Sequence, residues 1–144
     1  MKTVRQLLKG KGQEVLSVSP ENTVYDAMKL MADRNVGALL VLDHGKLCGI
    51  ISERDFARRL FSQNKAPKDI RVSELMTKDV VYVQPEMTNE DCMALMTDKR
   101  VRHLPVLDGD KVIGVISIGD LVKDTISDQR FIIEQLEHYI MGDR

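Results

Sequence analysis

The chain has 144 residues, of which 43% are hydrophobic and 30% charged, and its 21 basic and 22 acidic side chains leave a net charge near −1. This length suits one compact domain or two small units that share a core, and the composition is typical of a globular chain. A nearly neutral chain generates no overall field that would attract nucleic acid or an anionic membrane surface. We therefore expect no nucleic-acid and no membrane partner, and any anion site must be local.

The cysteines and the first residues bear on the compartment. Cys48 and Cys92 lie in apolar patterns without the spacing of a metal or redox motif, as expected for buried, reduced thiols. The opening MKTVRQLLKGKG lacks the apolar stretch of a signal peptide, and no apolar run approaches the roughly 18 residues of a membrane span. Together these patterns predict a cytoplasmic location.

An internal repeat dominates the sequence. A shift of 65 positions aligns residues 15–58 with residues 80–123 without a gap, and 20 of these 44 positions are identical. This level of identity indicates a duplicated supersecondary unit. Upstream of each copy, TVRQLL at 3–8 resembles RVSELM at 71–76, which predicts that each repeat owns a short leading helix.

In chain order, each copy predicts the same elements. Apolar alternation in VLSV (15–18) and VVYV (80–83) predicts a short strand that a proline, Pro20 or Pro85, stops. An amphipathic helix follows, over 24–34 in the first copy and around 92–99 in the second, where the apolar spacing is less regular. Two apolar runs around an Asp/Gly-rich turn then predict a hairpin, and Ser52 or Ser117 precedes a second helix.

The unit is therefore β-α-β-β-α, with an apolar face that it cannot cover alone. We expect a mixed α/β (α+β) fold in which the two repeats pack about a pseudo-two-fold axis. The predicted boundaries are repeat one with its N-terminal helix at 1–61, a polar linker at 62–70, repeat two at 71–127 and a C-terminal amphipathic helix at 128–144. The target of this last helix is either the same chain or a second copy.

Each repeat ends its hairpin with Gly, two aliphatic residues and Ser-x-x-Asp, in GIISERD (49–55) and GVISIGD (114–120). The structural interpretation is an N-cap serine with an acidic residue in the first turn, which is close to a capping box. The functional interpretation uses the same geometry, because backbone N–H groups and the hydroxyl face the space before the helix, and an ionised Asp accepts from a vicinal diol such as that of ribose.

Basic residues accompany both motifs. Arg54 and Arg58 flank Asp55, and Arg102 with His103 precede the hairpin of copy two where copy one has Gly37 and Ala38. Arginine is well suited to bidentate phosphate binding. Each arginine alone also fits a solvated helix face, and an Asp55 to Arg59 pair on the surface would contribute only about 0.3 to 0.5 kcal/mol. The cluster as a whole favours an anion site, and its asymmetry predicts two inequivalent sites.

These features resemble a tandem of CBS domains, also called a Bateman module, of the small stand-alone bacterial type. The resemblance extends from about Val4 to Ile126 and is carried by VYDAMKLM with DCMALM, VGALLVLD with VRHLPVLD, and GIISERD with GVISIGD. It implies adenosine-nucleotide binding in two clefts between the repeats. The nucleotide-binding residues it implies are Ser52, Arg54, Asp55, Arg58, Ala38, Leu39, Arg102, His103, Leu104, Pro105, Ser117, Gly119 and Asp120.

In this family pattern the Asp holds the ribose hydroxyls, the Ser lies near the sugar or phosphate, the strand residues contact adenine and the basic residues take phosphates. The resemblance therefore implies a non-enzymatic sensor of AMP, ADP, ATP or NAD that requires no cofactor and signals by a conformational or dimer change. S-adenosylmethionine fits the basic residues less well. Such modules commonly form flat dimers through their helices, so a homodimer and an unknown protein partner are expected.

The sequence allows two alternatives to the sensor to be compared. The main alternative is an interaction or assembly module that regulates a partner enzyme or transporter and has vestigial clefts. A hydrolase with Asp55 or Asp120 as its base lacks a nucleophile and a metal set. His44, His103 and His138 with the two cysteines match no zinc spacing, and the helical position of Cys92, where copy one has Ala27, predicts a core residue. No phosphate-loop or dinucleotide motif is present.

Overall fold

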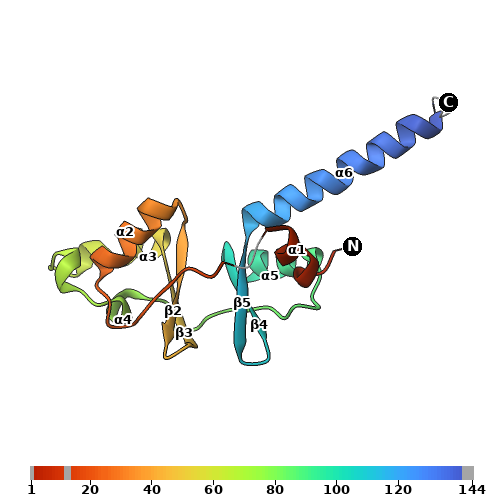
Figure 1. The fold of residues 1–144 in the computed structure, drawn as a ribbon. Helices are drawn as coiled ribbons and strands as arrows, with labels where there is room; N and C mark the ends of the chain where they lie inside the picture. Colours follow the sequence, from red (N-terminus) through yellow and green to blue (C-terminus); the bar gives the residue numbers. More distant parts are fainter. Residues whose placement is uncertain (1, 12–13, 141–144) are drawn as a thin grey trace.

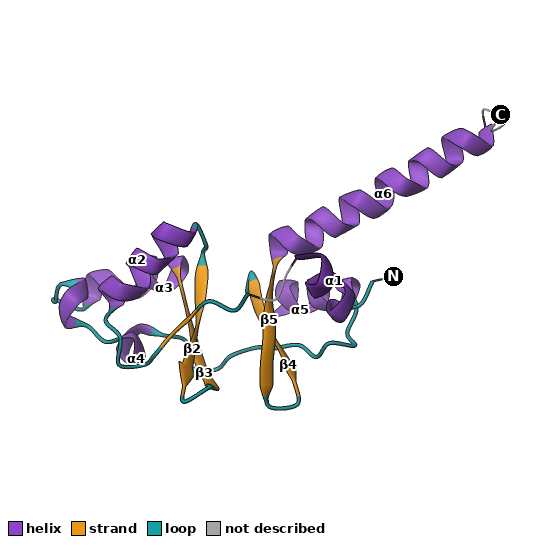
Figure 2. Ribbon diagram, viewed as in Figure 1, coloured by secondary structure: helices purple, strands orange, loops and turns teal. Residues whose placement is uncertain are grey.

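The computed structural model describes residues 2–11 and 14–140 (Figure 1). Two β-hairpins lie side by side at the centre, and helices cover the outer side of each (Figure 2). Strands β3 and β5 of the two repeats are in contact. The elements in chain order are α1 (Val4–Lys11), β1 (Ser17–Val18), α2 (Val24–Arg34), β2 (Ala38–Asp43), β3 (Lys46–Ser52), α3 (Glu53–Arg59), the short 3-10 helices η1 (Leu60–Ser62) and η2 (Pro67–Asp69), α4 (Val72–Leu75), α5 (Asn89–Lys99), β4 (His103–Asp108), β5 (Lys111–Ser117) and α6 (Ile118–Ile140).

Local signals build the two repeats in the same way. In α2, the Thr23 side chain accepts from the Asp26 amide while the Asp26 carboxylate accepts from the Thr23 amide, and Thr88 and Asp91 do the same for α5. These capping boxes satisfy amides that the first helical turn leaves unpaired. Both hairpins are antiparallel, and each has a register shift at the same place, between positions 41 and 42 and between 106 and 107. The mixed fold of two paired repeats is confirmed.

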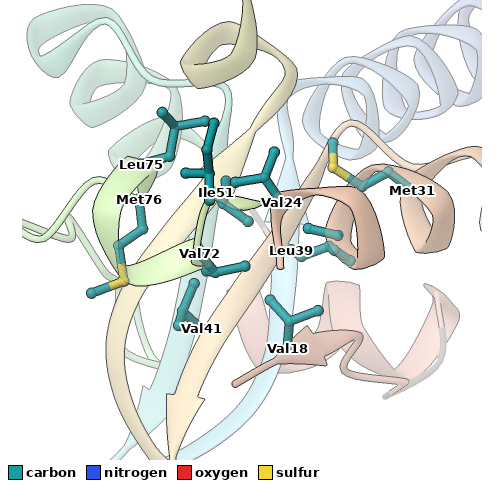
Figure 3. Packing of buried hydrophobic residues seen from close by; sticks show 11 residues of the cluster. Val18, Val24, Met31, Leu39, Val41, Ile51, Val72, Leu75 and Met76 are labelled. Carbon is teal, nitrogen blue, oxygen red and sulfur yellow. The ribbon is translucent and has the colours of Figure 1, made fainter. Parts of the chain in front are cut away.

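Each repeat has its own hydrophobic core. The first contains Val24 and Ala27 of α2, Leu39 of β2 and Ile51 of β3. The second contains the counterparts of the last three, Cys92 of α5, Leu104 of β4 and Ile116 of β5. Figure 3 shows the first core, in which Val72 and Leu75 of the α4 segment lie beside Val24, Val41 and Ile51, and Met76 lies at the edge of the same cluster. The α4 segment precedes the second repeat in the chain, yet it completes the core of the first.

The leading helices are thus exchanged relative to the sequence-based prediction. Val4 and Leu8 of α1 are buried in the second core, where the Val4 amide donates to the Met87 carbonyl at 2.8 Å. In the first repeat, the Val72 amide donates to the Asn22 carbonyl at the same distance. Residues 1–61 therefore do not form a self-contained unit. The order of the elements in the sequence predicted that each leading helix belongs to the repeat that follows it. Instead, α1 covers the hairpin of the second repeat and α4 covers the hairpin of the first, because an open apolar face can be covered by a helix from elsewhere in the chain.

Two glycines explain how closely the leading helices approach the hairpins. A Cβ added to Gly114 would lie 2.6 Å from Cδ2 of Leu8 in α1, and one added to Gly49 would lie 2.6 Å from Sδ of Met76 and 3.0 Å from the Thr77 carbonyl oxygen. All three distances are shorter than an ordinary van der Waals contact. The glycine in each GIIS or GVIS motif therefore provides the space in which the exchanged segment packs.

The opening strand of the second repeat is reduced to a single bridge between Val83 and Val106, whereas β1 pairs with β2 over two positions. The Leu40 amide donates to the Leu16 carbonyl at 3.2 Å in the first repeat. Pro105 stands at the position of Leu40 and has no amide hydrogen, so this hydrogen bond is missing from the second ladder.

The predicted linker and tail also differ from the structure. Ile70, at the end of the predicted 62–70 linker, is fully buried in the first core, and η1 and η2 occupy part of the remainder. The tail is not a separate helix beginning at residue 128, because α6 runs without a break from Ile118 to Ile140. Residues 120–140 contain no glycine or proline that would end it. Residues 141–144 of the predicted tail lie outside the described residues.

We predict that Gly49→Ala and Gly114→Ala each lower the free energy of unfolding by about 1 to 3 kcal/mol, the usual cost of overpacking. Gly49→Ala should cost more, since its Cβ would also meet the Thr77 backbone, whereas the Leu8 side chain can rotate. Urea denaturation measures both. Gly10→Ala in α1 is the control, because an added Cβ there has no neighbour within 4 Å. Equal stability of the Gly114 and Gly10 variants would contradict the packing of α1 on β5.

Candidate functional site

The first Ser-x-x-Asp motif forms a closed capping box. Oδ2 of Asp55 accepts from the Ser52 amide at 2.8 Å and from the Ser52 hydroxyl at 3.1 Å. Its other oxygen, Oδ1, accepts from the Thr77 hydroxyl at 2.9 Å, and Asp55 is only 7% exposed. Both carboxylate oxygens are thus engaged within the protein. In this arrangement Asp55 serves the fold, as the structural interpretation of the motif predicts.

The second motif is more open. Oδ2 of Asp120 accepts from the Ser117 amide at 2.8 Å, and the Ser117 hydroxyl accepts from the Asp120 amide at 3.2 Å. Asp120 is half-buried, and with Lys123 one turn further along α6 it lines a cavity of about 400 Å³. Leu7 and Gly10 of α1 form the opposite wall. This cavity brings together a carboxylate, an ammonium group and an apolar surface.

The difference between the two motifs comes from the exchanged leading segments. Thr77 follows α4 and supplies the hydroxyl that holds Asp55. The alignment of TVRQLL with RVSELM places Lys9 at the equivalent position beside the second repeat, and the Lys9 side chain is exposed. Sequence reasoning missed Thr77, Leu7 and Gly10 because they lie outside the aligned repeats. The signal available in the sequence was the resemblance of residues 3–8 to residues 71–76, which repeat at an offset of 68 residues instead of 65.

The hairpin register gathers the other predicted residues. Ala38 pairs with Ser52, and His103 pairs with Ser117, so each strand start lies beside the serine of its own motif. Leu39 and Leu104 are buried in the two cores, which leaves only their backbone for a ligand. Pro105 is also buried, whereas Gly119 is exposed in the first turn of α6.

Residues of the two repeats meet at the ends of β2 and β4. The His103 imidazole lies close to Gly37, whose added Cβ would be 3.5 Å from the ring. Arg54 of α3 donates to the Arg100 carbonyl at the end of α5, at 2.5 Å. Arg58 and Arg102 are exposed. The structure thus forms two contacts across the repeat boundary, one between Arg54 and the Arg100 carbonyl and one between His103 and Gly37. The anion site that the basic residues indicate stays a prediction.

A second hollow, of about 540 Å³, lies beside α4. It contains no residue of either Ser-x-x-Asp motif. Its lining residues are Arg59, Ser73, Glu74, Met76, Thr77, Lys78 and Asp79. The smaller cavity differs from it, because Asp120 of the second Ser-x-x-Asp motif forms part of its wall.

A buried polar cluster in the second repeat was not predicted. The Asn89 side-chain amide donates to Oδ2 of Asp124 at 2.9 Å and to the Leu121 carbonyl at 3.2 Å. The Lys2 ammonium lies 2.8 Å from Oδ1 of Asp124, and this pairing raises the pKa of Lys2. The first repeat has Val24, Arg59 and Ile70 at these positions. The cluster anchors the start of the chain to α6.

Metal and thiol chemistry receive no support within the described ranges 2–11 and 14–140. No group of three His, Cys, Asp or Glu side chains is arranged to hold a metal ion there. Cys92 is fully buried in the second core, and burial raises its pKa to about 11, as expected for a core thiol. No helix within these ranges is long and apolar enough to cross a membrane.

Comparison with known proteins agrees with this fold. A family model described as CBS domain matches residues 11–62 and 72–126. The chain is 38% identical to the mitochondrial CBS domain-containing protein CBSX3 of Arabidopsis thaliana, over 97% of this chain and 72% of that protein. It is 52% identical to a candidate signal-transduction protein with CBS domains from Burkholderia ambifaria, with a TM-score of 0.85 over 89% of this chain and 96% of that one.

A third relative bears on assembly. The hexameric CBS-CP12 protein from bloom-forming cyanobacteria is 30% identical, with a TM-score of 0.74 over 84% of this chain and 66% of that one. The chain belongs to the CBS-domain family and is a tandem of two CBS domains. Stand-alone proteins of this kind are regulatory, and no catalytic family is indicated.

We predict that Thr77→Val lowers the free energy of unfolding by about 1 to 3 kcal/mol, because the buried Asp55 carboxylate would lose a hydrogen-bond donor. Chemical denaturation checks this. Thr97→Val is the control, since the Thr97 hydroxyl is exposed and bonds only within its own helix, and its effect should stay within about 0.5 kcal/mol. Equal effects of the two substitutions would contradict a structural role for the contact between Thr77 and Asp55.

We also predict a pH dependence from Cys92. The unfolded thiol ionises near its ordinary pKa of 9.0, whereas the folded thiol stays neutral up to about 11. Below pH 9 the raised pKa of Cys92 therefore adds roughly 2 kcal/mol to the free energy of unfolding, and this contribution is lost between about pH 9 and 11. Urea denaturation across this pH range should show the loss. Cys92→Ala, which introduces the residue of the first repeat, should reduce the loss, and an unchanged profile would contradict the assignment.

Proposed function

We propose that this protein is a non-enzymatic sensor that binds an adenosine nucleotide, such as AMP, ADP, ATP or NAD, in the cavity at Asp120. The observation that carries the proposal is the joint presence of Asp120 and Lys123 in a cavity of about 400 Å³, a size within the usual range for small-molecule sites. A carboxylate is a suitable acceptor for ribose hydroxyls, and an ammonium group attracts phosphate. Leu7 offers an apolar surface to the base or sugar.

The two sites are inequivalent in this proposal. In the first repeat, both oxygens of Asp55 are held by Ser52 and Thr77, so a ribose would have to displace the Thr77 hydroxyl. The displaced Thr77 hydroxyl would lose its hydrogen bond to Asp55 and need another partner, which lowers the affinity for the nucleotide. We assign the tighter nucleotide site to the second repeat, because Asp120 and Lys123 line the cavity there. Arg54, Arg58, Arg102 and His103 remain the phosphate-binding candidates for a weaker first site.

The exchanged helix gives ligand binding a route to a conformational signal. The cavity lies between α1, which is joined in the chain to the first repeat, and α6 of the second. A nucleotide that contacts Leu7 and Lys123 together favours the arrangement in which these helices are close. Ligand shifts such an equilibrium only by its differential affinity for the two arrangements. The readout is then the relative placement of the repeats, or of two copies in a homodimer.

A second candidate function is an assembly module with vestigial clefts that regulates a partner enzyme or transporter by docking. The closed capping box at Asp55 favours it, since that motif is already satisfied without ligand. A cytoplasmic setting remains part of the proposal; one relative is mitochondrial. The two candidates differ in whether nucleotide binds at all.

Isothermal titration of AMP, ADP, ATP and NAD into the nucleotide-free protein tests the proposal. We expect saturable binding of at least one nucleotide that Asp120→Asn weakens about 10- to 100-fold, the usual cost of a charged hydrogen bond. Asp55→Asn should leave this binding event in place. Asp110→Asn, which changes an exposed carboxylate in the β4 to β5 turn, is the matched control. Absence of heat from all four nucleotides would refute the sensor and favour the docking module.

A further inference from the structure

The C-terminal part of α6 lies outside both hydrophobic cores. We call residues 126–140 the tail segment; every one of them is exposed. Figures 1 and 2 show it projecting away from both hairpins, beyond the helices that cover the second repeat. The family match also ends at residue 126. The tail segment is therefore an addition to the two CBS domains and contributes nothing to their cores.

This exposure is physically unfavourable for a helix of this composition. The tail segment is about 22 Å long at 1.5 Å per residue, and isolated helices of such length are marginally stable in water. Its apolar side chains are more than half exposed at six positions, which is far beyond the scattered apolar residues of an ordinary surface. These are Phe131, Ile132, Ile133, Leu136, Tyr139 and Ile140.

The spacing of these residues is that of a paired helix. Ile126, Gln129, Ile133, Leu136 and Ile140 follow one another at intervals of 3, 4, 3 and 4 residues. This alternation defines the a and d positions of a heptad repeat, whose side chains interdigitate with those of a second helix. Four of the five positions are aliphatic. The tail segment thus carries a coiled-coil seam of two heptads.

We propose that the tail segment pairs in antiparallel orientation with the tail segment of a second copy of this chain. In this arrangement Ile133 packs against Leu136 of the second copy, and Gln129 packs against Ile140 of the second copy. On one flank of the seam, Arg130 faces Glu137 of the second copy, and the two-fold symmetry repeats this ion pair. On the other flank, Ile132 faces Tyr139 of the second copy.

Charge selects this orientation and register. A parallel pairing would place Glu137 beside the apolar Ile132 of the second copy and would leave Arg130 near Thr125. An antiparallel pairing shifted by one heptad toward the body would place Arg130 opposite Arg130 of the second copy. Only the proposed register joins the opposite charges and keeps the aliphatic positions together. Within one helix, Arg130 and Glu137 are seven residues apart, too far to pair with each other.

This contact deepens the homodimer element of the proposed function by naming its surface, but it does not depend on nucleotide binding. Asp120 and Lys123 lie at the start of the same continuous helix. The oligomeric state of the nucleotide-free protein tests the contact, and titration calorimetry tests the ligand, so either proposal can fail without the other.

Sedimentation equilibrium of the nucleotide-free full chain is the first experiment. We expect a dimer whose dissociation constant rises at least 100-fold in Ile133→Asp. Phe131→Asp is the matched control, because Phe131 is similarly exposed, at 61% against 53% for Ile133, but occupies the heptad position facing away from the seam. A monomeric wild-type protein, or a dimer that both substitutions affect equally or not at all, would overturn the proposal.

A charge exchange then tests orientation. Arg130→Glu and Glu137→Arg each place like charges opposite one another, and we expect each to raise the dissociation constant of the dimer about tenfold. The double variant, with both substitutions in every copy, restores the pairs and should recover most of the affinity. Circular dichroism melting confirms that the two CBS domains stay folded in each variant. Failure of the double variant to recover affinity would overturn the antiparallel arrangement.

Discussion

The structure depends on the exchange of the two leading helices. Neither hairpin can bury its apolar face with the helices of its own repeat alone: the first core needs Val72, Leu75 and Met76, and the second needs Val4 and Leu8. The hairpin glycines, Gly49 and Gly114, leave the space into which these segments fit. Each repeat requires the leading segment that precedes the other repeat in the chain, so neither repeat can complete its core alone. This explains why the duplicated unit occurs as a pair.

The same exchange differentiates the two motifs. Asp55 and Asp120 both cap the helix that follows their hairpin, but the segment that packs beside each is different. Thr77 reaches Asp55 and satisfies its second oxygen, whereas Leu7 and Gly10 leave a cavity beside Asp120. Two copies of the same Ser-x-x-Asp pattern therefore acquire different surroundings. Both aspartates cap a helix, and the leading segment beside each one decides whether a threonine hydroxyl or a cavity lies next to it.

Helix α6 connects the candidate site to the molecular surface. Its first two turns carry Asp120 and Lys123 and are anchored through Asp124 to Asn89 and Lys2, and its later turns form the exposed tail segment. An unbroken helix transmits a displacement along its length better than two helices joined by a loop would. The anchoring cluster is not repeated in the first repeat, where Val24, Arg59 and Ile70 stand in place of Asn89, Asp124 and Lys2.

The sequence by itself determined the elements whose signals are local. The repeat, the hairpins, the helix at 24–34 and the mixed fold follow from apolar periodicity and turn residues, and the gathering of Ser52, Ala38, Ser117 and His103 follows from hairpin register. The sequence also predicted an opening strand at 80–83, which the structure reduces to one bridge between Val83 and Val106 beside Pro105, a residue without an amide hydrogen. Only the tertiary structure decided which leading helix covers which hairpin, that Thr77 closes the first motif and that α6 is continuous into the tail. These depend on contacts between residues distant in the chain, such as the 22 positions between Asp55 and Thr77, and no periodicity within a short window records such contacts.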